Sequence, residues 1–500
     1  MRPAVWAPDR GRVRVQLTDQ SGTREIELVA ERDGWWRAGE DLAPGTRYGY
    51  LLDDETEPVP DPRSYRLPDG VHGLTEAYDQ QAHQWTDQAW AGRPLAGAVI
   101  YELHVGTFTP GATLDSAIER LDHLVALGIS HVELLPVNAV NGVWNWGYDG
   151  VAWYAVHEPY GGPDALKRFV QACHQRGLAV LLDVVYNHLG ASGNYLPKFG
   201  PYLKSGRNTW GDLVNLDGPG STEVRRFIID NALGWLADLH LDGLRLDAVH
   251  ALVDSSPVHL LAQLAAEVTE LSGRLGRPLP LIAESDLNDP VMINPADDPD
   301  HPGYGLDAQW DDDVHHMLHA LLSGERHGYY ADFGELAGLA KVWQRAFFHD
   351  GTYSAFRGRP HGRPIEPAST PGWRFVACLQ NHDQIGNRAA GDRLSELVSD
   401  GLLRVGAVLL LTSPFTPMLF MGEEWAARTK WPFFTSHPEP ELATAVSQGR
   451  LAEFADHGWD ATTMPDPQDR QTYRGAVLDW SELDQPEHAS LLRLYRELIR

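Results

Sequence analysis

The chain has 500 residues, 43% of them hydrophobic and 22% charged, which is typical of a globular protein with one large domain and smaller modules. Its formal net charge of −28 argues against nucleic acids and anionic membrane surfaces as partners, because binding to polyanions depends on Lys and Arg. The N-terminus does not resemble a signal peptide, and the longest apolar stretch, residues 405–411, is too short to span a bilayer. With only two cysteines, Cys173 and Cys378, we expect buried thiols and a cytoplasmic protein.

Residues 1–88 predict a small β-sandwich that forms a separate module. Apolar and polar residues alternate in short runs, such as residues 13–17 and 47–52, and Gly, Pro and Asp turns separate these runs. We therefore place a domain boundary near residue 88.

Residues 89–500 predict an α/β fold, a (β/α)8 barrel, because candidate strands alternate with amphipathic helices. One such helix is expected over residues 113–128. Insertions at about 186–220 and 286–305 fall on strand-to-helix connections, where barrel enzymes build their active sites. The eight candidate strands are residues 98–105, 131–137, 179–185, 243–249, 280–285, 306–310, 375–382 and 418–424.

Three of these strands end in a carboxylate. Strand four carries Arg245 and Asp247 on one face of an otherwise apolar run, strand five ends at Glu284, and strand seven runs into Asp383. For strand four alone, a structural ion pair in the barrel core is the alternative interpretation. Three carboxylates at one end of a barrel, however, raise each other's proton affinity and cost stability, which favours a role in catalysis.

Retaining glycoside hydrolysis requires such a group of carboxylates. One attacks the anomeric carbon and a second, protonated one donates to the leaving oxygen from about 5 to 5.5 Å away. We predict that Asp247 is the nucleophile, kept ionised by Arg245. Glu284 is the predicted general acid/base, whose proton is retained to higher pH beside Asp247 and Asp383, and Asp383 is the third essential carboxylate.

Two further segments carry groups that suit a sugar. His188, at the end of strand three, can donate to a sugar hydroxyl, although a lone His at a strand end is often structural. Asp183 and Asn187 in the same segment are expected to brace loops. The loop after strand two, residues 144–150, contains Tyr148 and two tryptophans, whose rings either stack on pyranose rings or simply pack.

Four segments match, in order, the four short motifs of the α-amylase superfamily of glycoside hydrolases: residues 183–188, 243–250, 283–285 and 381–383. The chain therefore resembles this superfamily over essentially the whole barrel. The resemblance implies the roles given above to the three carboxylates. It also implies that the subsite for the distorted sugar is lined by Arg245, His188, His382 and Tyr148. His250, at the end of the second motif, is a further expected substrate contact.

Within the superfamily, the chain is most similar to the enzymes that cleave the α-1,4 bond next to the terminal trehalose unit of maltooligosyltrehalose. The segments that carry this similarity are residues 60–64, 68–73, 283–290, 380–388 and 418–425. The resemblance implies trehalose release, an N-terminal carbohydrate-binding-like module and a pathway partner, maltooligosyltrehalose synthase. It also implies a C-terminal β-domain, which is absent from this sequence, so we expect the sequence to be cut short.

Two segments are candidates for contacting the trehalose end. They are the loop at residues 351–357, after strand six, and the turn Glu423-Glu424-Trp425, after strand eight. Ordinary packing at the barrel rim is the alternative for both.

Other functions share these features. A glycogen branching or debranching enzyme, or an α-amylase, would have the same barrel and carboxylates but act on α-1,4-glucan without yielding trehalose. A non-catalytic glucan-binding protein is an alternative of another class, against which the intact set of carboxylates argues. Some amylases bind calcium through the Asn equivalent to Asn187, but we see no surrounding cluster of oxygen ligands and expect no metal and no cofactor.

Overall fold

Two small antiparallel sheets form the first part of the chain in the computed structural model, which describes residues 1–19, 22–456 and 464–500. One sheet has the order β3-β2-β6-β7 and the other β1-β5-β4. The predicted alternation is confirmed, since every second residue of β2 is buried in the core, beginning with Val13. The strands are β1 (Ala4–Trp6), β2 (Val13–Asp19), β3 (Gly22–Glu27), β4 (Val29–Ala30), β5 (Trp35–Arg37), β6 (Arg47–Leu52) and β7 (Thr75–Glu76).

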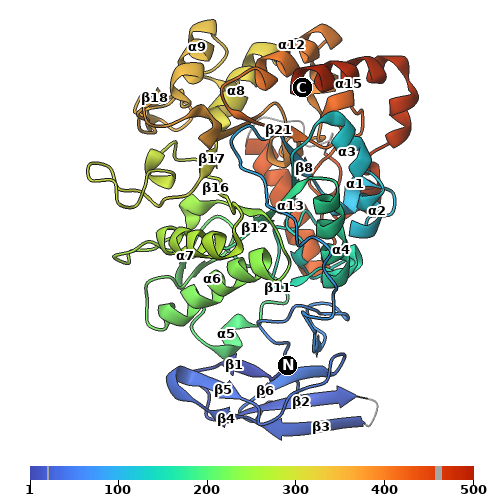
Figure 1. The fold of residues 1–500 in the computed structure, drawn as a ribbon, viewed down its shortest axis with the longest axis vertical. Coiled ribbons are helices and arrows are strands. Elements are labelled where there is room, and N and C mark those ends of the chain that lie inside the picture. Colours follow the sequence, from blue (N-terminus) through green and yellow to red (C-terminus); the bar gives the residue numbers. More distant parts are fainter. Residues whose placement is uncertain (20–21, 457–463) are drawn as a thin grey trace.

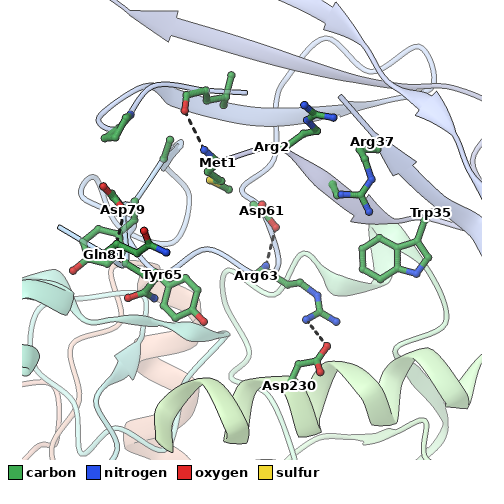
Figure 2. Close-up of a pocket in the computed structure, with 16 residues that line it drawn as sticks. Met1, Arg2, Trp35, Arg37, Asp61, Arg63, Tyr65, Asp79, Gln81 and Asp230 are labelled. Carbon is green, nitrogen blue, oxygen red and sulfur yellow. Dashed lines mark hydrogen bonds and ion pairs between the residues drawn. The ribbon is translucent and has the colours of Figure 1, made fainter. Parts of the chain in front are cut away.

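Arg63, which follows β6, is one of the residues that join these sheets to the barrel. Its Nη1 donates to Asp230 Oδ2 over 3.0 Å, and its guanidinium lies 5.6 Å from the ring centroid of Trp35. Figure 2 shows Arg63 reaching down to the helix that carries Asp230, beside a cavity of about 680 Å³ between the two parts of the chain. An ion pair and a cation–π contact thus fix the sheets at one end of the molecule (Figure 1).

The predicted (β/α)8 barrel is confirmed. Eight parallel strands close in the order β12-β15-β16-β17-β20-β21-β8-β9, and all six residues of β12 are buried, as expected for a strand covered on both faces. The strands are β8 (Ile100–Leu103), β9 (His131–Leu134), β12 (Ala179–Val184), β15 (Gly243–Leu246), β16 (Leu281–Ala283), β17 (Ala308–Trp310), β20 (Phe375–Cys378) and β21 (Thr416–Phe420).

Seven of these strands lie within their predicted ranges but are shorter. Most end before the predicted residue because the chain leaves the sheet there and turns into the loops that carry the candidate site residues. β21 instead begins earlier than predicted, because Thr416 and Pro417 pair with Val376 and Ala377 of β20.

Helices cover the outside of the barrel (Figure 1). The expected single helix over residues 113–128 is wrong: the structure has α2 (Leu114–Ile118) and α3 (Leu121–Leu127), since tighter i to i−3 hydrogen bonds at Arg120 and His123 interrupt it. The longer helices are α4 (Gly162–Gln175), α6 (Ser221–Ala237), α7 (Leu260–Leu275), α8 (Asp312–Ser323), α9 (Leu336–Arg345), α12 (Asp400–Leu411), α13 (Pro440–Asp456) and α15 (Pro486–Ile499).

The connections add short elements, mostly at the loops after the strands. The insertion after β12 contains a helix and a hairpin, and a second hairpin follows β9. The elements are α1 (Val105–Phe108), β10 (Asn138–Ala139), β11 (Ala152–Val156), α5 (Leu196–Phe199), β13 (Leu203–Arg207), β14 (Asp212–Val214), β18 (Tyr353–Ser354), β19 (Arg359–Pro360), α10 (His382–Gly386), α11 (Leu394–Leu397) and α14 (Arg470–Gly475).

Two sequence-level features can be checked in the described part of the chain. Cys173 and Cys378 are both free and buried, as expected. Within residues 1–19, 22–456 and 464–500, no helix has the length and apolar character needed to cross a membrane.

Candidate active site

A buried arginine at the end of β15 organises the site. Arg245 is fully buried, and its Nη1 lies 2.6 Å from Asp183 Oδ2 and 2.8 Å from Asp247 Oδ1. Its Nη2 is 3.6 Å from Glu284 Oε2. The pair of Arg245 and Asp247 therefore exists, but it is part of a larger cluster with carboxylates from three neighbouring strand ends. One guanidinium fixes the two carboxylates that the sequence predicts to act as nucleophile and general acid/base.

The backbone after Asp247 holds Glu284. Ala248 adopts a left-handed conformation, with φ 41° and ψ 49°, which costs a residue with a side chain about 1 kcal/mol or more. In that conformation its N–H donates to Glu284 Oε2, 2.5 Å away. Val249 N–H also donates to the Glu284 carbonyl over 3.0 Å. The turn after β15 thus positions the carboxyl group carried by β16.

Asp383 is the most open of the three predicted carboxylates. It lies in the first turn of α10, which Asn381 caps by accepting from Gln384 N–H over 2.8 Å. Its side chain is 44% exposed, against 12% for Asp247 and 14% for Glu284. Asp383 is therefore the carboxylate most open to solvent, while the other two are mostly covered by the protein.

The electrostatics of the cluster favour a protonated Glu284. Burial is the largest influence and raises the pKa of Glu284, the Arg245 charge lowers it, and Asp247 and Asp383 raise it again, to about 8. The pKa is raised as expected from the sequence, although the sequence pointed to the neighbouring charges and not to burial. At neutral pH most Glu284 carboxyls carry the proton that a general acid must donate.

Sequence reasoning missed a fourth carboxylate, Asp312, in the first turn of α8. Burial and the charge of Asp383 raise the pKa of Asp312 to about 7, and Asp312 in turn raises the pKa of Glu284. A signal was present, because three aspartates follow strand six directly in residues 311–313.

His382 is held in its charged form. Its Nδ1 lies 2.6 Å from Glu102 Oε1 on β8, and its Nε2 lies 2.8 Å from the Tyr148 hydroxyl, which donates to Asp183. Burial lowers the pKa of His382, but the charges of Asp383 and Glu102 outweigh it and raise the pKa to about 9. The sequence did not single out Glu102, although it is a lone carboxylate in an apolar strand.

Replacing Glu102 by Gln should reduce the pH dependence of stability that His382 contributes. An unfolded His has a pKa near 6.5. The raised folded pKa therefore stabilises the protein below about pH 6.5, and this contribution, on the order of 3 kcal/mol, disappears as pH rises through about 9. Urea denaturation of both proteins at pH 6 and pH 9.5 measures how much the free energy of unfolding falls between these two pH values. This fall should be smaller by about 1–2 kcal/mol in the variant than in the parent. An equal loss in both would contradict the assignment.

Asn187 and Asp183 differ from their expected role. Asn187 Nδ2 donates to Asp247 Oδ2 over 2.7 Å, so the Asn187 side chain holds the predicted nucleophile. The backbone carbonyl of Asn187 accepts from Asn208 Nδ2, and this contact is the one that braces a loop. Asp183 binds Arg245 and Tyr148. Among the described residues, no group of three or more His, Cys, Asp or Glu is arranged to hold a metal ion.

The two remaining predicted histidines lie on the same side of the site. His188 is buried, and its ring nitrogens lie 2.6 Å from Asn187 Oδ1 and 2.9 Å from the Tyr148 carbonyl. Its ring stacks on Trp210, with centroids 5.9 Å apart. His250 is partly exposed at the rim, 3.8 Å from Asp286 Oδ1. Direct donation from His188 to a sugar would have to replace one of its protein partners.

The two segments considered for the trehalose end differ. Arg357 of the loop at residues 351–357 lies 3.0 Å from Asp286, so this loop borders the site. The turn Glu423-Glu424-Trp425 is buried, with Glu424 0% exposed and bound to His123 and Tyr101, so its assignment as a trehalose contact is wrong. Packing beneath α15, the alternative interpretation, accounts for the turn.

Comparisons with known proteins identify the family of this chain. The model of the alpha amylase catalytic domain matches residues 106–214. The malto-oligosyltrehalose trehalohydrolase of Arthrobacter ramosus is 62% identical over 99% of this chain and 86% of its own length, and that of Mycobacterium tuberculosis H37Rv is 55% identical over 99% and 85%. A crystal structure from Salmonella typhimurium, assigned as an alpha amylase, superposes with a TM-score of 0.91 at 38% identity, covering 100% of this chain and 83% of that one. The chain belongs to the malto-oligosyltrehalose trehalohydrolase family, within the α-amylase family of glycoside hydrolases.

Proposed function

We propose that this protein hydrolyses the α-1,4 bond next to the terminal trehalose unit of maltooligosyltrehalose and releases trehalose. The observation that carries a retaining mechanism is the pairing of Asp247, fixed by Arg245 and Asn187, with Glu284, whose pKa is raised to about 8. Preference for a trehalose end is supported by the names of relatives that match nearly the whole chain.

The reaction proceeds by double displacement. Asp247 attacks the anomeric carbon while Glu284 donates its proton to the glycosidic oxygen, so the C–O bond breaks and trehalose leaves with that proton. Water then attacks the glycosyl-Asp247 ester, and the Glu284 carboxylate accepts a proton from that water, which regenerates both groups. Asp383, the most exposed carboxylate of the three, accepts hydrogen bonds from sugar hydroxyls.

The same proposal assigns the neighbouring groups. Tyr148 and His382, whose rings lie 5.0 Å apart and nearly parallel, form one wall for the sugar at the cleavage site. His188 supports that wall through its contact with the Tyr148 carbonyl, and His250 at the rim contacts substrate. Arg245 holds the carboxylates in place.

The organisation of the chain is part of the proposal. We assign residues 1–88 to a carbohydrate-binding-like module and residues 89–500 to the catalytic barrel; the two sheets and the closed barrel support this division. A maltooligosyltrehalose synthase is the proposed pathway partner, since an enzyme must first convert the reducing end of a maltooligosaccharide into the trehalose unit.

The test supplies the purified protein with maltooligosyltrehalose or with the maltooligosaccharide of equal length, and chromatography follows trehalose and reducing sugar. Rapid trehalose release from the first, with little action on the second, supports the proposal. Cleavage or transfer on both without trehalose would instead assign an amylase or branching activity to the same carboxylates.

A further inference from the structure

Glu133 is a buried carboxyl group of the barrel that the proposed mechanism does not use. It lies on β9, and the residue is 1% exposed. In the part of the chain that the structure describes, neither of its side-chain oxygens has a hydrogen-bond partner. The large majority of buried side-chain polar atoms in proteins are hydrogen-bonded. The partners of Glu133 must therefore come from something other than a direct contact with another side chain.

The strand register places Glu133 on the same face of the barrel sheet as Arg245. Glu133 pairs with Glu102 of β8 and with Leu181 of β12. Paired residues of parallel strands point to the same face, and residues two apart on one strand share that face. Asp183 lies two residues after Leu181 and pairs with Arg245 of β15. Glu133, Asp183 and Arg245 therefore project into one interior region, from three consecutive strands of the barrel.

Two other groups on this face have polar atoms without partners. Asp183 binds Arg245 Nη1 and the Tyr148 hydroxyl through Oδ2, whereas its buried Oδ1 has no hydrogen-bond partner among the residues described. The same is true of the buried Nε of Arg245. A carboxyl group, a carboxylate oxygen and a guanidinium N–H thus lie unpaired on neighbouring strands. Each would lose its hydration without compensation if nothing bound to it.

Glu133 carries a proton at neutral pH. Burial is the largest influence and raises the pKa of Glu133 well above its usual value, and the charges of Glu102 and Asp183 raise it further. Arg245 and His382 lower the pKa of Glu133, but they do not outweigh burial. A protonated carboxyl group has one O–H donor and an acceptor oxygen. It can therefore serve a carboxylate oxygen and a guanidinium N–H at the same time.

We propose that Glu133 is a positioning residue, joined through bound water to Asp183 Oδ1 and Arg245 Nε. Water is the ligand that fits, because no two of these groups are hydrogen-bonded to each other and a buried water makes about three hydrogen bonds to such groups. With Oδ1 held in this way, Asp183 cannot rotate away from Arg245, and Arg245 keeps its contact with Asp247. The effect on catalysis rests on the proposed function, whereas the protonation and the water do not.

Two substitutions of Glu133 separate hydrogen bonding from simple packing. Glu133→Gln keeps a donor and an acceptor in nearly the same shape, so kcat/KM for trehalose release should stay within about twofold. Glu133→Met fills a similar space without either, and kcat/KM should fall about 20-fold. Glu270→Gln, which changes an exposed helical ion pair, is the surface control and should have no effect. Equal kcat/KM values for the Gln and Met variants would overturn the proposal.

The pH dependence of kcat/KM distinguishes positioning of Arg245 from a general loosening of the fold. Arg245 lowers the pKa of Glu284, which burial nevertheless raises to about 8. If Glu133→Met lets the guanidinium move away, the alkaline fall of kcat/KM should shift to higher pH by about half a unit or more. In Glu133→Gln the fall should stay at about pH 8. An unshifted profile in Glu133→Met would overturn the link to Arg245.

An infrared spectrum tests the protonation without relying on trehalose release or on the Met variant. At pH 9.5 Glu284 and Asp312, with pKa values raised to about 8 and about 7, are ionised, whereas Glu133 should remain protonated. The spectrum of the parent at this pH should contain a carboxylic-acid carbonyl band that Glu133→Gln loses and Glu270→Gln keeps. If the Gln variant lost no such band, the protonated state would be wrong.

A crystal structure of the parent tests the water directly. It should show water hydrogen-bonded to Glu133 and to Asp183 Oδ1, and a direct hydrogen bond between the two side chains would overturn the water link. If the parent released no trehalose, the proposed function would be wrong, yet the infrared band and the bound water could still be observed. Failure of the proposed function and failure of this inference therefore give different results.

Discussion

Replacing Asp247 by Asn should lower kcat for trehalose release by about 10⁴-fold or more, because the amide cannot form the glycosyl ester. The fold should persist, since Asn has nearly the same shape and its carbonyl can still accept from Arg245 Nη1. The amide nitrogen, however, would face the Asn187 amide, which now donates to Asp247 Oδ2. We expect a loss of about 1–2 kcal/mol in the free energy of unfolding, measured with urea.

The matched control is Asp122→Asn, whose side chain is 82% exposed and pairs with Arg176 on the surface. Its activity and stability should equal those of the parent. A fluorinated glucosyl donor whose ester hydrolyses slowly should label the parent at Asp247, as mass spectrometry of peptides would show, and should not label the variant. Activity of Asp247→Asn within tenfold of the parent would remove Asp247 as nucleophile and favour a non-catalytic role for the cluster.

The sequence identified the barrel and its three strand-end carboxylates because each rests on a local pattern. A charge in an apolar strand, as at Arg245 and Asp247, stands out without any knowledge of the fold. The partners of these groups were not predictable in the same way. Asn187 is close to Asp247 only because β12 and β15 are neighbours in the barrel, and nothing in its local sequence distinguishes this contact from a loop brace.

Burial was the other quantity that the sequence did not contain. The turn at residues 423–425 looks like a polar rim segment, yet Glu424 is fully buried because Tyr101 and His123 supply its hydrogen bonds. The protonation of Glu284 likewise depends first on its burial. The burial of the turn and the main cause of the raised Glu284 pKa were missed for the same reason, since solvent exposure is a property of the assembled barrel and not of the segment.

Replacing Glu284 by Gln should lower kcat/KM for trehalose release by about 10²–10⁴-fold and also change its pH dependence. The proton donor is the protonated carboxyl, with a pKa raised to about 8. In the parent, kcat/KM should therefore fall as pH rises through about 8, because the acid is lost. The variant has no proton to lose at this position, so its residual activity should be flat across the same range.

Chemical rescue distinguishes the roles of Glu284 and Asp383. Glucosyl fluoride needs no acid to leave, and azide needs no base to attack, so together they should restore turnover in Glu284→Gln. Asp383→Asn loses contacts to the sugar instead of a proton donor, and the same reagents should not rescue it.

The pH profile gives a separate test of Glu284. If kcat/KM of Glu284→Gln still fell as pH rose through about 8, another titrating group would control that fall. Asp312, with a pKa raised to about 7, is the nearest alternative, and Asp312→Asn would then abolish the decline that Glu284→Gln left unchanged.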